Sequence, residues 1–235
     1  MFNTLKPAII LSAIALTLTA CLGGGSSEPT KYYTIAVESI SMPSAGTYAD
    51  KRLQVRKFTI EPAYQRTNIV YRESAYDFMF YDLDLWASRP EHMLAQVASE
   101  YLAKSNLFKS VETKASGKPD YELLGNIVAI EEVDEGSSQY ARLAVQLTFR
   151  KTESDEALWE KSFDQKMSMG DREPRTTAET VSKLYGKIME EALGDICLIL
   201  KKVDTTQKSR SSANEDKTGN KESRGIRPVR ISPMD

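Results

Sequence analysis

Apolar and polar residues alternate along much of the chain, which predicts β-strands. The clearest alternation places Leu143, Val145, Leu147 and Phe149 between mainly polar neighbours, as in a strand with one buried and one wet face. Aromatic and β-branched segments predict further strands. These cover residues 32–37, 53–60 with a phase break near Lys57, 68–72, 77–86, 108–113, 121–132 and 159–167. The last three consecutive strands, including that at 143–149, suggest an antiparallel meander.

Two segments carry apolar residues at helical spacing instead. The first opens with Ser88 and Glu91 as an expected capping box and Pro90 in its first turn. The second opens with a similar box of Thr176 and Glu179 and ends near residue 203. Their apolar stripes comprise Leu94, Val97, Ala98, Tyr101 and Leu102, and Val181, Leu184, Tyr185, Ile188, Met189, Ala192, Leu193, Ile196 and Leu200.

The order of these elements predicts an α+β fold. Two helices with one apolar stripe each need a common surface, and a sheet with one wet face supplies it. We therefore expect a two-layer domain, with a mostly antiparallel β-sheet and two amphipathic helices packed on one face.

The N-terminal segment has the layout of a bacterial lipoprotein signal. Lys6 precedes an apolar stretch, and Leu18-Thr19-Ala20-Cys21 ends it with a small residue before cysteine. The sequence predicts a signal peptide over 1–20 and lipid attachment at Cys21; the alternatives are an ordinary secretory signal or a short membrane anchor. Residues 21–30 are then a lipidated flexible tether, 31–203 the domain, and 204–235 a polar disordered tail.

The residue after Cys21 bears on location. Leu22 stands where an aspartate commonly marks retention in the inner membrane of Gram-negative bacteria. Leucine in place of that aspartate favours a lipid anchor in the outer membrane, with the domain facing the periplasm.

The composition and the motifs of the chain give no pattern typical of nucleic-acid binding, catalysis or metal binding. The net charge is −2 with both signs interspersed, so no basic footprint for nucleic acid exists. We predict no catalytic set, no metal and no cofactor, because His92 is the single histidine and no Gly-rich phosphate loop follows a strand. Asp82 and Asp84 are expected on a solvated face, and Cys197, within an apolar run, is expected as a buried thiol.

One aromatic segment is a candidate partner surface. Phe78 and Phe80 share one face of a predicted strand, while Tyr81 lies on the other. They pack in the core or form an exposed patch for self-association, protein contact or lipid contact. Trp86 either joins that surface or is buried at the strand-to-helix corner.

Three motifs give the chain a family resemblance. They are Tyr32-Tyr33-Thr34-Ile35 soon after the lipobox, Ile69-Val70-Tyr71-Arg72, and Trp86-Ala87-Ser88-Arg89-Pro90 before the first helix. In this order they resemble the ABC-type transport auxiliary lipoprotein family, which includes the paraquat-inducible protein C lipoproteins. The resemblance covers roughly residues 21–203, and the tail after Asp204 has no counterpart in it.

The resemblance implies a non-enzymatic lipoprotein of a lipid-transport system. Its implied partners are an MCE-domain protein, which forms a conduit between the membranes, and an ABC transporter or related inner-membrane complex. A homo-oligomer is compatible with docking on a tubular partner. The alternative function is a lipid-binding or outer-membrane-assembly lipoprotein that carries amphiphiles itself, which requires a sizeable apolar pocket.

Overall fold

The computed structural model describes residues 28–37, 48–114 and 117–222. The predicted signal peptide, Cys21 and most of the tether lie outside these residues. The chain divides into two units, residues 1–31 and 32–235, and the fold given below is that of the second unit.

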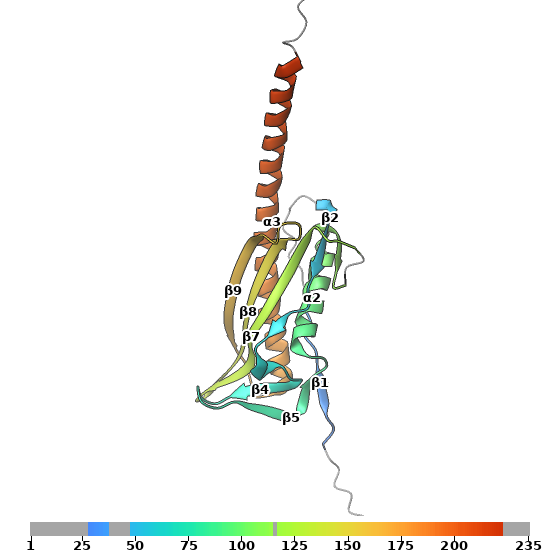
Figure 1. Cartoon of the computed structure of the whole chain (residues 1–235). Helices are drawn as coiled ribbons and strands as arrows, with labels where there is room; N and C mark the ends of the chain where they lie inside the picture. The colour runs from blue at the N-terminus through green and yellow to red at the C-terminus, as the bar shows by residue number, and fades with distance from the viewer. Residues whose placement is uncertain (1–27, 38–47, 115–116, 223–235) are drawn as a thin grey trace, which may run out of the picture. The chain divides into compact units, whose positions relative to one another are not determined.

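The described residues form a nine-stranded sheet and two α-helices (Figure 1). Residues 53–60 split at the predicted phase break into two strands, joined by the irregular residues 56–58. The 3₁₀ turn η2 (Pro62–Tyr64) follows β3. The strands are β1 (Lys31–Tyr33), β2 (Tyr48–Val55), β3 (Thr59–Ile60), β4 (Asn68–Arg72), β5 (Met79–Trp86), β6 (Phe108–Glu112), β7 (Tyr121–Glu135), β8 (Ser138–Lys151) and β9 (Ala157–Ser168).

Strand β7 is the centre of the sheet. One of its edges pairs antiparallel with β8, which pairs antiparallel with β9. Its other edge carries β2, β3 and β4 in succession, all parallel to β7. Strand β6 extends the sheet beyond β2, and β5 and then β1 extend it beyond β4.

The predicted antiparallel character therefore holds for only part of the sheet. The meander β7–β8–β9 and the β4–β5 pair are antiparallel, whereas β2, β3 and β4 run parallel to β7 and β2 runs parallel to β6. Parallel neighbours need a crossover connection, and the helix after β5 provides it. Local alternation cannot reveal this, because it reports which face is buried and not the direction of the partner strand.

Neither helix begins where its predicted capping box requires: α2 begins one residue later and α3 begins three residues earlier. Helix α2 spans Pro90–Lys104, and its N-cap is Arg89, without a side-chain cap bond from Ser88. Helix α3 spans Pro174–Glu222, so Thr176 lies inside its first turn. Both predicted capping boxes were wrong, since a proline with preset φ supplies the first helical residue in each case.

The end of α3 also differs from the prediction. The helix continues to Glu222, through the first part of the segment predicted to be disordered from Asp204 onward. Residues 204–222 contain no proline, so no residue there forces the helix to end. Residues 223–235 lie outside the described residues.

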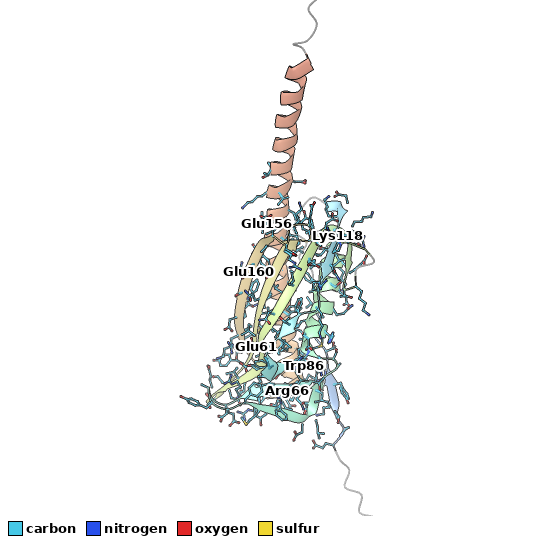
Figure 2. All side chains as sticks on the ribbon, in the orientation of Figure 1. Glu61, Arg66, Trp86, Lys118, Glu156 and Glu160 are labelled. Carbon is cyan, nitrogen blue, oxygen red and sulfur yellow. The ribbon has the colours of Figure 1, made fainter. Side chains whose placement is uncertain are left out.

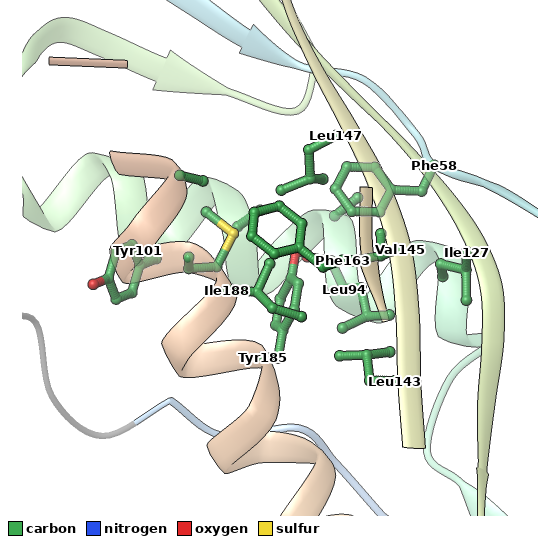
Figure 3. Close-up of a cluster of buried hydrophobic side chains, with 14 of the residues drawn as sticks. Phe58, Leu94, Tyr101, Ile127, Leu143, Val145, Leu147, Phe163, Tyr185 and Ile188 are labelled. Carbon is green, nitrogen blue, oxygen red and sulfur yellow. The ribbon is translucent and has the colours of Figure 1, made fainter. Parts of the chain in front are cut away.

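The two helices and the sheet enclose one core, which confirms the two-layer α+β fold. Helix α3 packs on β8 and β9, and α2 packs on β6 and β2. Figure 3 shows Tyr185 and Ile188 of α3 facing Leu143 and Val145 of β8. The Tyr185 hydroxyl donates to the carbonyl oxygen of Leu94 in α2 at 2.8 Å, which joins the helices.

Cys197 is buried in the core, as expected, and this burial raises the pKa of its thiol.

The core packs most closely where β7 meets the segment between β2 and β3. Gly125 of β7 lies against the ring of Phe58, where an added Cβ would lie 2.6 Å from ring atoms. Only glycine lets the segment between β2 and β3 pack this closely on β7.

Candidate partner-binding surface

The predicted aromatic segment forms a cluster at one end of the sheet. Figure 2 places Arg66 and Trp86 at this end, with Lys118 at the other. The rings of Tyr64 and Phe78 meet edge to face with centroids 5.3 Å apart, and those of Tyr71 and Tyr81 lie 4.8 Å apart. We call this set of four rings, with Phe80, the aromatic end.

Two arginines lie over the aromatic end. The Arg66 guanidinium carbon is 4.7 Å from the ring centroid of Phe80 and 5.7 Å from that of Phe78. The Arg72 guanidinium carbon is 6.0 Å from the Phe78 ring, and its nitrogens donate to the carbonyl oxygens of Asp77 and Ala75. The cation–π contacts place Phe78 and Phe80 on one face, as predicted. The Arg72 hydrogen bonds to Asp77 and Ala75 fix the β4–β5 turn.

Buried carboxylates support the cluster from β7. Glu131 is 2% exposed and accepts from the Tyr64 hydroxyl at 2.5 Å and from Arg142 Nη1 at 2.8 Å. Glu132 is fully buried and accepts from the hydroxyls of Tyr81, at 3.2 Å, and Thr177, at 2.9 Å. Burial raises the pKa of Glu132, whereas the hydrogen bonds from Thr177 and Tyr81 lower it by a smaller amount.

Glu131 and Glu132 were not among the site residues predicted from the sequence. Neighbouring residues of a strand face opposite sides, so Glu131 lies on the open face and Glu132 on the helix-covered face. A bulge between Ile127 and Ala129 shifts this alternation by one residue. Two adjacent glutamates inside a long apolar strand could have indicated these sites, because each face of that strand then carries a buried charge that needs a partner.

The aromatic residues proposed for a partner surface differ in exposure. Trp86 is 2% exposed and therefore packs in the core at the strand-to-helix corner. Phe78 and Tyr81 are half-buried, whereas Phe80 is 43% exposed. Three further exposed apolar or aromatic side chains lie on the same group of elements: Tyr32 in β1, Tyr76 in the β4–β5 turn and Leu83 in β5.

The two aspartates that were predicted on a solvated face lie on a different element from the single histidine. Asp84 accepts from the Tyr33 hydroxyl at 2.8 Å, Asp82 is exposed on β5, and His92 is exposed on α2. Across residues 28–37, 48–114 and 117–222, no group of three or more His, Cys, Asp or Glu side chains is arranged to hold a metal. In the same residues, no helix has the length and hydropathy needed to cross a membrane.

A pocket of about 430 Å³ lies at the opposite end of the sheet. Its lining is rich in charge and includes three lysines and three carboxylates, with Leu200 and Val203 of α3 forming an apolar wall. This is not the apolar cavity that an amphiphile carrier requires. The charged residues are Lys51, Lys118, Lys151, Asp120, Glu153 and Asp204.

Several solved structures resemble this chain at low sequence identity. A crystal structure of a Xanthomonas campestris protein assigned to the family DUF330 has a TM-score of 0.66 at 15% identity, over 74% of this chain and 99% of that one, and shares its fold. The PelC dodecamer of Paraburkholderia phytofirmans has a TM-score of 0.40 at 11% identity, covering 64% and 91%. The lipoprotein GNA1162 of Neisseria meningitidis has a TM-score of 0.35 at 10% identity, covering 62% and 97%.

Curated proteins gave no match to this sequence. The pattern of one protein family, in contrast, matches residues 33–192, which include both helix starts, the aromatic end and most of the core. The chain therefore belongs to the family of ABC-type transport auxiliary lipoprotein components.

Proposed function

We propose that this chain is a non-enzymatic lipoprotein that docks a periplasmic MCE-domain conduit at the outer membrane, as part of an ABC-type intermembrane lipid-transport system. The observation that carries the proposal is the family match over residues 33–192. The lipobox ending at Cys21 adds the anchor, and Leu22 favours the outer membrane. Lipid attachment at this cysteine leaves the domain on a short tether at the membrane surface.

The aromatic end is the surface we assign to the conduit protein. Interface anchors are enriched in aromatic side chains and arginine, held rigidly at the centre of a contact. Phe80 meets this description, since its ring is exposed while Arg66 stacks on it and Glu131 and Glu132 fix the rings beneath. A rigid exposed ring loses little conformational entropy when a partner covers it.

A binding role also suits the chemistry of the buried acids. Glu131 and Glu132 contact arginine, tyrosine and threonine side chains, which are structural partners. Their burial beneath the rings serves to orient side chains. The family description likewise assigns an auxiliary role in transport.

Affinity capture tests the proposal. The full-length lipoprotein, extracted with mild detergent, should retain an MCE-domain protein identified by mass spectrometry. Phe80→Ala should weaken this retention. Val128→Ala should not, because Val128 is as exposed as Phe80, at 43%, but lies on the β7 bulge, outside the aromatic end. Retention of no MCE or ABC component by a well-expressed, folded protein would contradict the proposal.

A further inference from the structure

Strand β9 forms a long edge of the sheet. It spans twelve residues without proline or glycine and, among the described residues, pairs only with β8. Figure 1 shows it as the outermost strand on its side. An exposed edge of this length presents a row of backbone donors and acceptors to another strand, unless charges or bulges protect it. Its register with β8 shifts only near Ala157, so Trp159–Ser168 is regular.

The backbone groups that face outward can be assigned. The Met169 N–H donates to the Gln139 carbonyl oxygen at 2.8 Å, so residue 169 turns its backbone groups toward β8. Successive residues of a strand turn these groups to opposite sides. The outward row therefore belongs to the even-numbered residues Glu160, Ser162, Asp164 and Lys166.

We propose that β9 is a self-complementary edge through which two copies of this chain pair antiparallel. The two-fold axis passes through Phe163, which lies opposite Phe163 of the second copy. Ser162 then hydrogen-bonds through its backbone with Asp164 of the other copy, and Glu160 with Lys166. The proposal stands independently of the docking function.

Charge selects this register. Glu160 and Lys166 both point to the open face of the sheet, and antiparallel pairing brings them together twice, once on each side of the axis. A shift of the axis to Ser162 would place Glu160 opposite Asp164, which is a like-charge contact. A shift to Asp164 would place Lys166 opposite Ser162 and form no ion pair.

Both charges are already held on the open face. Glu160 accepts from Gln146 Nε2 at 2.8 Å, and the Lys166 ammonium lies 4.3 Å from the ring centroid of Tyr140 and pairs with Glu135. These contacts reach back toward β8 and the β7–β8 turn, so the two exposed side chains must turn to the outer edge of β9 to pair with the second copy.

The helix-covered face fits the same register. Trp159 and Met167 lie on that face of β9 and would meet across the axis, on both sides of the paired Phe163 rings. Helix α3 lies over β8 and β9, where Asp195 accepts from Trp159 Nε1 at 3.2 Å. With strands about 4.8 Å apart, the two α3 helices would lie about 10 Å apart, a normal packing distance. The second copy therefore fits beside the first without a clash of helices.

Charge reversal and charge exchange test the pairing. Native mass spectrometry of the detergent-solubilised, lipidated chain should show a dimer once the protein concentration reaches about 100 µM. Glu160→Lys and Lys166→Glu should each weaken it about tenfold or more, since two attractive contacts become repulsive. The combined E160K/K166E variant should restore it, and Lys109→Glu on the other edge strand, β6, should have no effect. A monomeric wild type, or a combined variant as weak as the single ones, would overturn the proposal.

Engineered cysteines test the register itself. In a hydrogen-bonded antiparallel pair the opposed Cα atoms lie about 5.5 Å apart, which suits a disulfide. The double variant S162C/D164C should therefore form a covalent dimer on mild oxidation, while S162C alone and D164C alone should not. A dimer linked by S162C alone would move the axis to residue 162 and refute the proposed register. Circular dichroism confirms that each variant is folded.

Discussion

Replacing Gly125 with alanine should destabilise the domain, because the new methyl group has no space. Its Cβ would lie 2.6–2.7 Å from three ring atoms of Phe58, which is 1% exposed and cannot swing into solvent. Overpacking a core costs about 1–3 kcal/mol, and the entropy gained on replacing glycine returns less than about 1 kcal/mol. Because Phe58 cannot move away, the cost should lie near the top of this range, about 3 kcal/mol, and we expect a net loss of about 2 kcal/mol.

Thermal unfolding followed by circular dichroism measures this loss. For a domain of this size, about 2 kcal/mol corresponds to a Tm lowered by about 4–8 °C. Gly170→Ala is the matched control, since nothing lies within 4 Å of the place its methyl group would take, and it should leave Tm unchanged or slightly raised. Adding Phe58→Leu to Gly125→Ala should cost less than the sum of the two changes, because the smaller side chain relieves the contact. An unchanged Tm for Gly125→Ala would refute the packing assigned to Phe58.

Three further predictions follow from particular contacts. Glu132 has a raised pKa, so the folded state binds its proton more tightly and stability should fall as pH rises above the ordinary value of 4.5; Glu132→Gln should remove this part of the slope in urea titrations across pH and raise stability at pH 7. Tyr185→Phe removes the hydrogen bond to the Leu94 carbonyl and should cost about 0.5–1.5 kcal/mol in urea unfolding, while an unchanged midpoint would show that this bond contributes nothing. Cys21→Ser should move the protein from the membrane fraction to the soluble periplasmic fraction, and persistence in the membrane would argue against lipid attachment at this residue.

Periodicity predicted the elements whose burial depends on one face. The alternation around Leu143 gave β8 and the helical stripe around Tyr185 gave α3, because each apolar row packs against the other. The α+β fold class could be predicted because a sheet face and a helix stripe, each apolar, must cover one another. Parallel pairing of β2, β3 and β4 with β7 could not be predicted, because the crossover through α2 decides strand direction.

The aromatic end shows the same limit. Phe78 and Phe80 were placed on one face by strand alternation, and Arg66 lies beside both rings. The sequence left open which of the aromatic residues are exposed, because this depends on the neighbours of β5. Trp86 is covered by the core while Phe80 is not, and the register of β4 with β5 shifts between those two positions.

Photocrosslinking from position 80 tests the central claim most directly. A photoreactive phenylalanine analogue at Phe80, in cells that express the whole transport system, should crosslink to an MCE-domain protein, while the same analogue at the equally exposed Val128 should not. The docking account predicts this difference between two positions of the same folded lipoprotein. Crosslinking to no MCE-domain protein from Phe80, or equal crosslinking from Val128, would contradict it.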